Sequence, residues 1–351
     1  MRLRGASALA LVILGSTGCV IQDDVQEIRD TLPRASAIQV KVPGGTQASA
    51  LAIASGQQAR TAPPIIIGGQ QARTAPLVVK GGVGSSTHAV LGQTAQFYAF
   101  TRLISGHLNL GAAFVLTLVH SVAHFPPTSV QGDTYIWGPW TNALNPAEWR
   151  LTVRLNAQGS YEWSLEGRRK AGGGSFEAVV AGVATPGTSH RGSGWFDMDF
   201  DKAEELDPVG NDAEGKIRVQ YDLEASPVKV IMDFANDMKM PDGSIADKTF
   251  HYVYAEAQDG SGDFEFSMYG DLDDNGSAWE NTDVKSRWLA TGAGRSDFRV
   301  AGGDLGDQVL TGSECWGTSF GRSYWTDSLG WHPTEGDPAS CAFSDARLPG
   351  Q

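Results

Sequence analysis

Residues 149–155 read WRLTVRL and residues 161–166 read YEWSLE, so apolar and polar side chains alternate in both segments. Alternation with a period of two places all the apolar residues on one face of a β-strand. The five residues between the segments, 156–160, include Gly159 and are typical of a tight turn. The two segments therefore predict a β-hairpin with one apolar face and one solvated face.

The same alternation returns further along the chain, where polar and charged residues separate the apolar ones. The apolar positions are Phe196, Met198 and Phe200; Ile217, Val219, Tyr221 and Leu223; Val228, Val230, Met232 and Phe234; Phe250, Tyr252 and Tyr254; and Phe264, Phe266 and Met268. We therefore expect a mainly β fold, in which roughly eight to eleven strands form a curved antiparallel meander or open half-barrel.

Residues 93–124 follow a different period. Apolar side chains recur there at intervals of three and four residues: Phe97, Phe100, Ile104, Leu108, Val115, Leu118 and Val122. This spacing indicates a helix, and two prolines at 126 and 127 prevent its continuation. The second half of the segment is apolar nearly all round, which is typical of a helix that is buried on most sides. We expect one long apolar helix packed in the concave face of the sheet.

This arrangement looks like the half-barrel of periplasmic lipoprotein carriers and lipid-binding lipoproteins. The likeness lies in the order of the elements and in no shared motif. It implies that a hydrophobic small molecule could bind between the helix and the curved sheet, unless side chains simply fill that space.

The N-terminus begins with Arg2 and Arg4, continues with uncharged residues 6–14, and reaches small residues just before Cys19. This pattern resembles a bacterial lipoprotein signal peptide. The resemblance implies that residues 1–18 are removed and that lipid on Cys19 anchors the protein to a membrane. Ser16 stands where the family usually has leucine, and cleavage as an ordinary secreted protein is the alternative. Val20 in place of aspartate favours the outer membrane, with the protein facing the periplasm or the cell surface.

Residues 19–90 differ in composition from the rest of the chain, because Ala, Gly, Gln, Thr and Pro dominate. The sequence GQQARTAP occurs twice, at residues 56–63 and 69–76. Such composition rarely builds a core. We expect a low-complexity tether at 19–90, followed by a single β-rich domain at 91–351.

Two cysteines remain once Cys19 is set aside, namely Cys315 and Cys341. In an oxidising compartment, two cysteines in one domain predict a disulfide. The chain has 27 basic and 40 acidic residues, which gives a net charge of -13. This excess of acid argues against a nucleic-acid partner, since such binding depends on neutralising phosphates.

Asp271, Asp273 and Asn275 are spaced like the oxygen ligands of a calcium loop and are followed by a glycine. They resemble the first half of an EF-hand loop. The twelfth position is Thr282 where the EF-hand has glutamate, although Asp283 lies next to it. Calcium is the one cofactor that the sequence suggests, and a plain acidic turn between strands is the alternative.

His120 and His124 are four residues apart and project from one face of the predicted helix. They could hold a metal together if a third ligand were nearby. The alternative is that they bond to carbonyls at the helix C-terminus, where histidine is favoured.

The sequence contains no nucleophile elbow or other recognisable catalytic motif. We therefore expect an exported, membrane-anchored lipoprotein that is not an enzyme and that binds a hydrophobic ligand. The alternatives are a hydrolase of envelope or extracellular polymers, with a site assembled from loops, and a calcium-dependent adhesion or scaffold protein.

Overall fold

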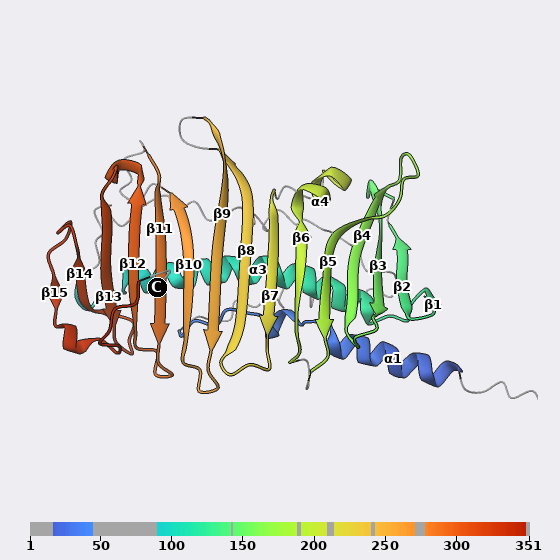
Figure 1. Cartoon of the computed structure of the whole chain (residues 1–351), viewed down its shortest axis with the longest axis horizontal. Helices are drawn as coiled ribbons and strands as arrows, with labels where there is room; N and C mark the ends of the chain where they lie inside the picture. Colours follow the sequence, from blue (N-terminus) through green and yellow to red (C-terminus); the bar gives the residue numbers. More distant parts are fainter. Residues whose placement is uncertain are drawn as a thin grey trace, which may run out of the picture.

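A computed structural model describes residues 17–44, 90–141, 143–187, 191–208, 214–239, 243–270 and 278–348. Within these residues, fifteen strands form one antiparallel sheet in which every strand pairs with its neighbours in sequence (Figure 1). The sheet is open, because β1 and β15 lie at its two ends and do not pair with each other. The predicted mainly β antiparallel meander is confirmed.

The strands are β1 (Ser129–Gln131), β2 (Thr134–Trp140), β3 (Ala147–Leu155), β4 (Tyr161–Arg169), β5 (Glu177–Thr185), β6 (Ser193–Asp199), β7 (Lys216–Asp222), β8 (Val228–Lys239), β9 (Ile245–Glu256), β10 (Gly262–Gly270), β11 (Glu280–Trp288), β12 (Gly294–Gly302), β13 (Val309–Trp316), β14 (Arg322–Asp327) and β15 (Glu335–Gly336). The hairpin predicted from residues 149–166 is formed by β3 and β4, with Val153 opposite Trp163.

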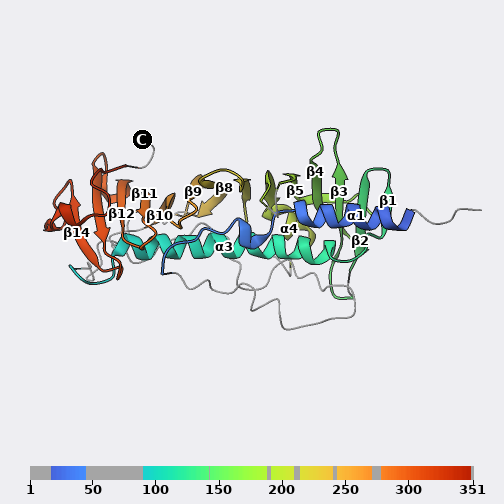
Figure 2. The same cartoon turned by 90° about the horizontal axis from the view of Figure 1, so that it is seen from below.

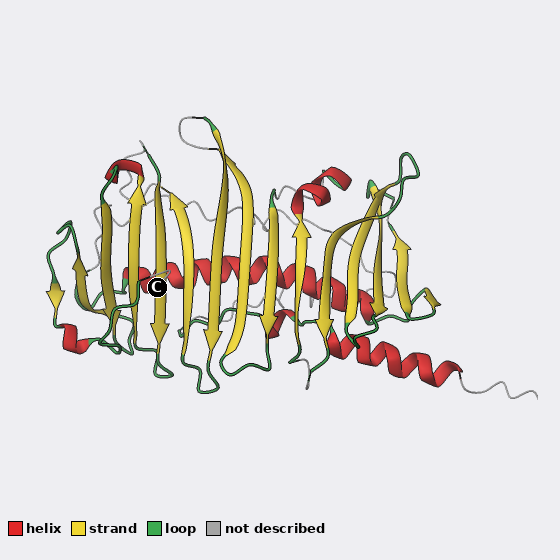
Figure 3. Cartoon of the chain, in the orientation of Figure 1, coloured by secondary structure: helices red, strands yellow, loops and turns green. Residues whose placement is uncertain are grey.

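The expectation of a single apolar helix has to be corrected. The described residues form three α-helices, α1 (Thr17–Thr31), α3 (Gln96–Ala123) and α4 (Phe200–Leu206), and three short 3-10 helices, η1 (Ala35–Ala37), η2 (Gly303–Leu305) and η3 (Pro338–Ser340). Helix α3 crosses the strands along one face of the sheet (Figures 1 and 3). It is not apolar all round, since Arg102 and His107 are exposed on it. In the part of the chain that the structure describes, no helix is both long and apolar enough to cross a membrane.

Part of the predicted tether at 19–90 packs against the sheet. We call residues 17–44 the N-terminal segment. Val25 and Ile28 of α1, and Leu32 directly after it, are buried completely or nearly so in the same core as the sheet. These three residues are spaced by three and four, which is a helical apolar stripe that the composition of the longer region concealed. Both copies of GQQARTAP lie outside the described residues.

The N-terminal segment runs antiparallel to α3, beside it on the same face of the sheet (Figure 2). Side chains of α3 bond to its backbone along the way. The amide of Asn109 donates to the Val40 carbonyl at 2.9 Å and accepts from the Val40 N–H at 2.8 Å. The hydroxyl of Tyr98 donates to the Pro43 carbonyl at 2.7 Å. The cover of the sheet therefore consists of α3 and this segment together.

The core lies between the sheet and this cover, and aromatic side chains form much of it. The largest fully buried side chains include Trp149, Trp288, Trp316, Trp325, Phe196, Phe264 and Phe298. At the β11 to β13 end the same face also buries polar side chains, among them Thr282, Ser286 and Glu314. Because these strands lack strict apolar alternation, the sequence predicted fewer strands than the fifteen that form.

Candidate functional site

Four hydrogen-bond donors on strands β2, β3, β4 and β7 are buried without an acceptor among the described residues. They are the indole nitrogens of Trp140, Trp149 and Trp163 and the hydroxyl of Tyr221, and none has a partner in the described part of the chain. We call these four groups the unpaired donors. Trp163 and Tyr221 are only 2 % and 5 % exposed. A buried polar group without a partner costs about 1–3 kcal/mol, so four of them in one region call for an explanation.

Two of these side chains lie opposite glycines on the neighbouring strand. Trp163 lies opposite Gly182, and Tyr221 lies opposite Gly194. A Cβ atom on Gly194 would come within 2.6 Å of the Tyr221 hydroxyl oxygen. Burial raises the pKa of this hydroxyl well above its ordinary value, so it remains a neutral donor at physiological pH.

Three other buried tryptophans have acceptors. The indole N–H of Trp137 donates to the Phe125 carbonyl at 2.7 Å. The indoles of Trp288 and Trp316 donate to the carbonyls of Gly260 and Gly292, at 3.2 and 2.9 Å. Satisfied indoles are thus present at both ends of the molecule.

Helix α3 is held in place at its N-terminus by a buried carboxylate. Glu314 on β13 accepts the backbone N–H groups of Gln96 and Phe97, at 2.9 and 2.5 Å. It also accepts from Arg322 on β14 at 2.6 Å, and both charged side chains are fully buried. Burial raises the pKa of Glu314, whereas the guanidinium of Arg322 acts in the opposite direction. The carboxylate therefore fixes where α3 crosses the sheet.

The other face of the sheet carries charged side chains paired between neighbouring strands. Asp197 pairs with Arg218 at 2.6 Å, and Asp199 pairs with Lys216 at 2.9 Å. The alternating carboxylates of β6 are thus balanced individually by cations of β7. These contacts confirm the solvated face that alternation predicted for these strands.

The two candidate metal-binding histidines make different contacts in the structure. The Nε2 atom of His120 lies 3.1 and 3.0 Å from the carbonyl oxygens of Leu32 and Pro33. The backbone carbonyl of His124 accepts from Arg29 at 2.8 Å. Both residues therefore contact the N-terminal segment. No cluster of three or more potential metal ligands occurs among the described residues, and metal binding by this pair stays a prediction.

The candidate calcium loop is described only in part. Asp271, Asp273 and Asn275 lie outside the described residues. Asp283 lies within β11, where it accepts from the Ser267 hydroxyl at 2.7 Å and lies 3.7 Å from Arg299. Its side chain is thus engaged by the neighbouring strands β10 and β12. Calcium binding by the loop stays a prediction.

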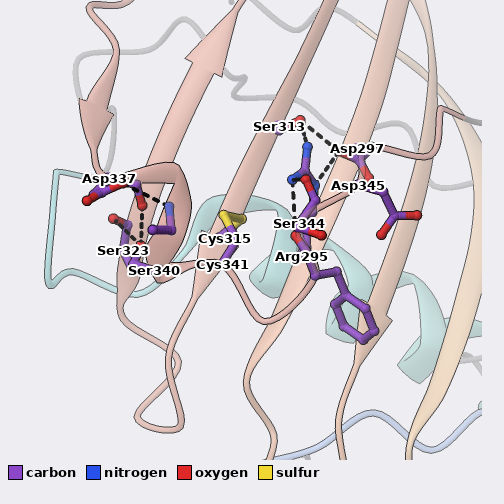
Figure 4. Close-up of a disulfide and its surroundings, with 12 residues drawn as sticks. Arg295, Asp297, Ser313, Cys315, Ser323, Asp337, Ser340, Cys341, Ser344 and Asp345 are labelled. Carbon is purple, nitrogen blue, oxygen red and sulfur yellow. Dashed lines mark hydrogen bonds and ion pairs between the residues drawn. A yellow bond between two sulfur atoms is a disulfide. The ribbon is translucent and has the colours of Figure 1, made fainter.

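The predicted disulfide between Cys315 and Cys341 is confirmed (Figure 4). Cys315 lies on β13, and Cys341 directly follows η3 in the C-terminal tail, residues 337–348. The bond holds the tail against the face of the sheet opposite α3, beside a buried charge cluster that the sequence did not predict.

This cluster contains two arginines that lie directly opposite each other, Arg287 on β11 and Arg295 on β12. Asp297 lies between them and accepts from Arg287 at 3.1 Å and from Arg295 at 2.7 Å. The tail completes the cluster, because the Asp345 carbonyl accepts from Arg287 and the Phe343 carbonyl accepts from Arg295. Figure 4 shows Arg295, Asp297 and Asp345 close to one another. The tail therefore covers the cluster and adds acceptors to those of Asp297.

Cys19 lies in the first turn of α1. Comparison with protein-family models, with curated proteins and with solved structures found no match.

Proposed function

We propose that the protein is an exported lipoprotein without enzymatic activity, which is anchored through Cys19 and binds a hydrophobic ligand between α3 and strands β2 to β7. In this proposal the sheet curves as a half-barrel with α3 in its concave face. The anchor holds the protein at the outer membrane, facing the periplasm or the cell surface. Calcium, if bound at the loop that follows β10, is an addition to this role.

The observation that carries the ligand proposal is the set of unpaired donors. Native proteins rarely leave buried donors without acceptors, and ordered water or a ligand supplies the acceptor where the protein does not. The surrounding side chains are apolar and aromatic, among them Leu151, Leu165 and Phe196. A ligand for this region would be mainly apolar and would carry hydrogen-bond acceptors, as an acyl ester does.

Native mass spectrometry tests the ligand proposal. The protein should be produced as residues 20–351, because the N-terminal segment belongs to the core. We expect a bound species of lipid mass that organic extraction removes. A protein that has only the mass of its polypeptide, before and after extraction, would contradict the proposal and assign the unpaired donors to ordered water.

Two matched variants separate ligand binding from general destabilisation. Trp163→Phe removes an unpaired donor, whereas Trp288→Phe removes a donor that bonds to the Gly260 carbonyl. We expect Trp163→Phe to lower the fraction of protein with bound lipid and Trp288→Phe to leave that fraction unchanged. If both variants lose the bound species equally, the indole at 163 does not contact the ligand.

A further inference from the structure

Helix α1 begins close to the predicted lipid and is fixed to the body a short way along. Between Cys19 and Asp24 the helix advances by five residues, which corresponds to about 7.5 Å at 1.5 Å per residue. Asp24 accepts a hydrogen bond of 2.7 Å from the Tyr135 hydroxyl of β2. No flexible spacer therefore separates Cys19 from the sheet.

The attachment of α1 to the body continues beyond Asp24. Arg29 donates to the carbonyls of Ala123 and His124, at 2.6 and 2.8 Å, and so bonds to the C-terminus of α3. Ile28 is fully buried in the core. These contacts fix both the position and the orientation of α1, whose N-terminal end projects past β1 (Figure 2).

Three exposed apolar side chains lie next to residues that contact this part of α1. Val130, which is 37 % exposed, lies opposite Tyr135 on the neighbouring strand. Leu155, also 37 % exposed, lies opposite Tyr161, which lies near the carboxylate of Glu27 of α1. Phe125, which is 46 % exposed, directly follows His124, whose carbonyl accepts a hydrogen bond from Arg29. Each of the three is the direct neighbour, across the sheet or along the chain, of a residue that lies against α1. We call these three residues the apolar rim.

From these observations we infer that the β1 to β4 end of the molecule rests directly on the bilayer that holds the anchor, with the apolar rim in contact with lipid. This inference rests on the proposed lipidation of Cys19. The acidic residues Asp24, Glu27 and Asp133 lie near Tyr135, so the contact fits a zwitterionic lipid surface better than an anionic one.

The opposite end of the sheet should then stand far from the membrane. Fourteen intervals between neighbouring strands, at about 4.8 Å each, separate β1 from β15 by about 67 Å. Leu329, in the connection between β14 and β15, is 40 % exposed and serves as a matched position at that end. The two ends are thus distinguishable by their depth relative to a bilayer.

The test uses the full lipidated chain in phosphatidylcholine vesicles. Val130→Cys and Leu329→Cys each provide one free thiol for a fluorophore, since Cys315 and Cys341 are joined. Nitroxide-labelled lipids should quench the fluorophore at position 130 at least several-fold more than the one at position 329. Equal quenching at both positions, or no quenching of protein that floats with the vesicles, would overturn the inference while leaving the anchor intact. Protein that does not float with the vesicles at all would overturn the lipidation and this inference together.

Discussion

Glu314 connects parts of the chain that are more than two hundred residues apart, since it accepts the backbone N–H groups at the start of α3 from its place on β13. Its charge is also the partner of the fully buried Arg322. Removing one member of such a pair leaves the other buried and uncompensated, and that is where the energetic cost arises.

We therefore expect Glu314→Gln to lower the free energy of unfolding by about 3–5 kcal/mol. Urea denaturation monitored by circular dichroism measures this change. The matched control is Glu162→Gln, because Glu162 pairs with Arg154 on the exposed face, where both side chains are more than 40 % accessible. The control should change the free energy by less than about 1 kcal/mol. Similar losses in the two variants would contradict the capping role of Glu314.

Tyr135 gives a prediction about alkaline pH. Burial, assisted by the hydrogen bond to Asp24, raises the pKa of its hydroxyl to about 12 from an ordinary value of 10.0. An acid with a raised pKa in the folded state stabilises the fold below the pKa of the unfolded state, and this contribution is lost as the pH rises. The stability advantage of the native protein over Tyr135→Phe should thus shrink between about pH 10 and about pH 12. A difference that stays constant with pH would contradict the assignment.

At the scale of elements, the N-terminal segment shows where sequence reasoning succeeds and where it fails. Alternation identified β3 and β4 because one face of each is apolar and the other is solvated. Composition assigned α1 to a tether, because its few apolar residues lie within a long region whose overall composition resembles a linker. The unpaired donors could not be predicted either, since the absence of an acceptor depends on what packs around each indole in the folded chain.

The role of α1 as part of the core can be tested directly. Ile28→Ala removes a fully buried side chain, and such truncations typically cost about 2–5 kcal/mol. Gln26→Ala, at an exposed position of the same helix, should have an effect within about 0.5 kcal/mol. Chemical denaturation of the two variants gives the comparison. A neutral Ile28→Ala would return α1 to the role of a tether.

The disulfide joins the C-terminal tail to β13. Joining residues 26 positions apart restricts the unfolded chain, which corresponds to about 3 kcal/mol on the chain-entropy model. We expect the double variant Cys315→Ser with Cys341→Ser to lose about this much stability. Hydrogen exchange should also increase in β11 and β12, where the tail covers Arg287 and Arg295. Unchanged exchange there would show that the charge cluster alone retains the tail.

At the scale of the whole molecule, the meander has two different faces and two different ends. One face is covered by α3 and the N-terminal segment, and the other carries paired charges and, near the C-terminus, the tail. The alternation of side chains made the two faces predictable. The difference between the two ends was not predictable. The sequence does not show that α1 packs against β2 and lies beside the apolar rim.

In this proposal, the lipid anchor at Cys19 sets the orientation of the molecule relative to the membrane. The anchor is tested directly by mass spectrometry of the N-terminal peptide from protein extracted with detergent from bacterial membranes. The proposal predicts a peptide that begins at Cys19 and carries the added mass of acyl chains, together with release of a Cys19→Ser variant from the membrane fraction. An N-terminal peptide that retains residues 1–18, or that begins elsewhere without acyl mass, would contradict both the anchor and the orientation derived from it.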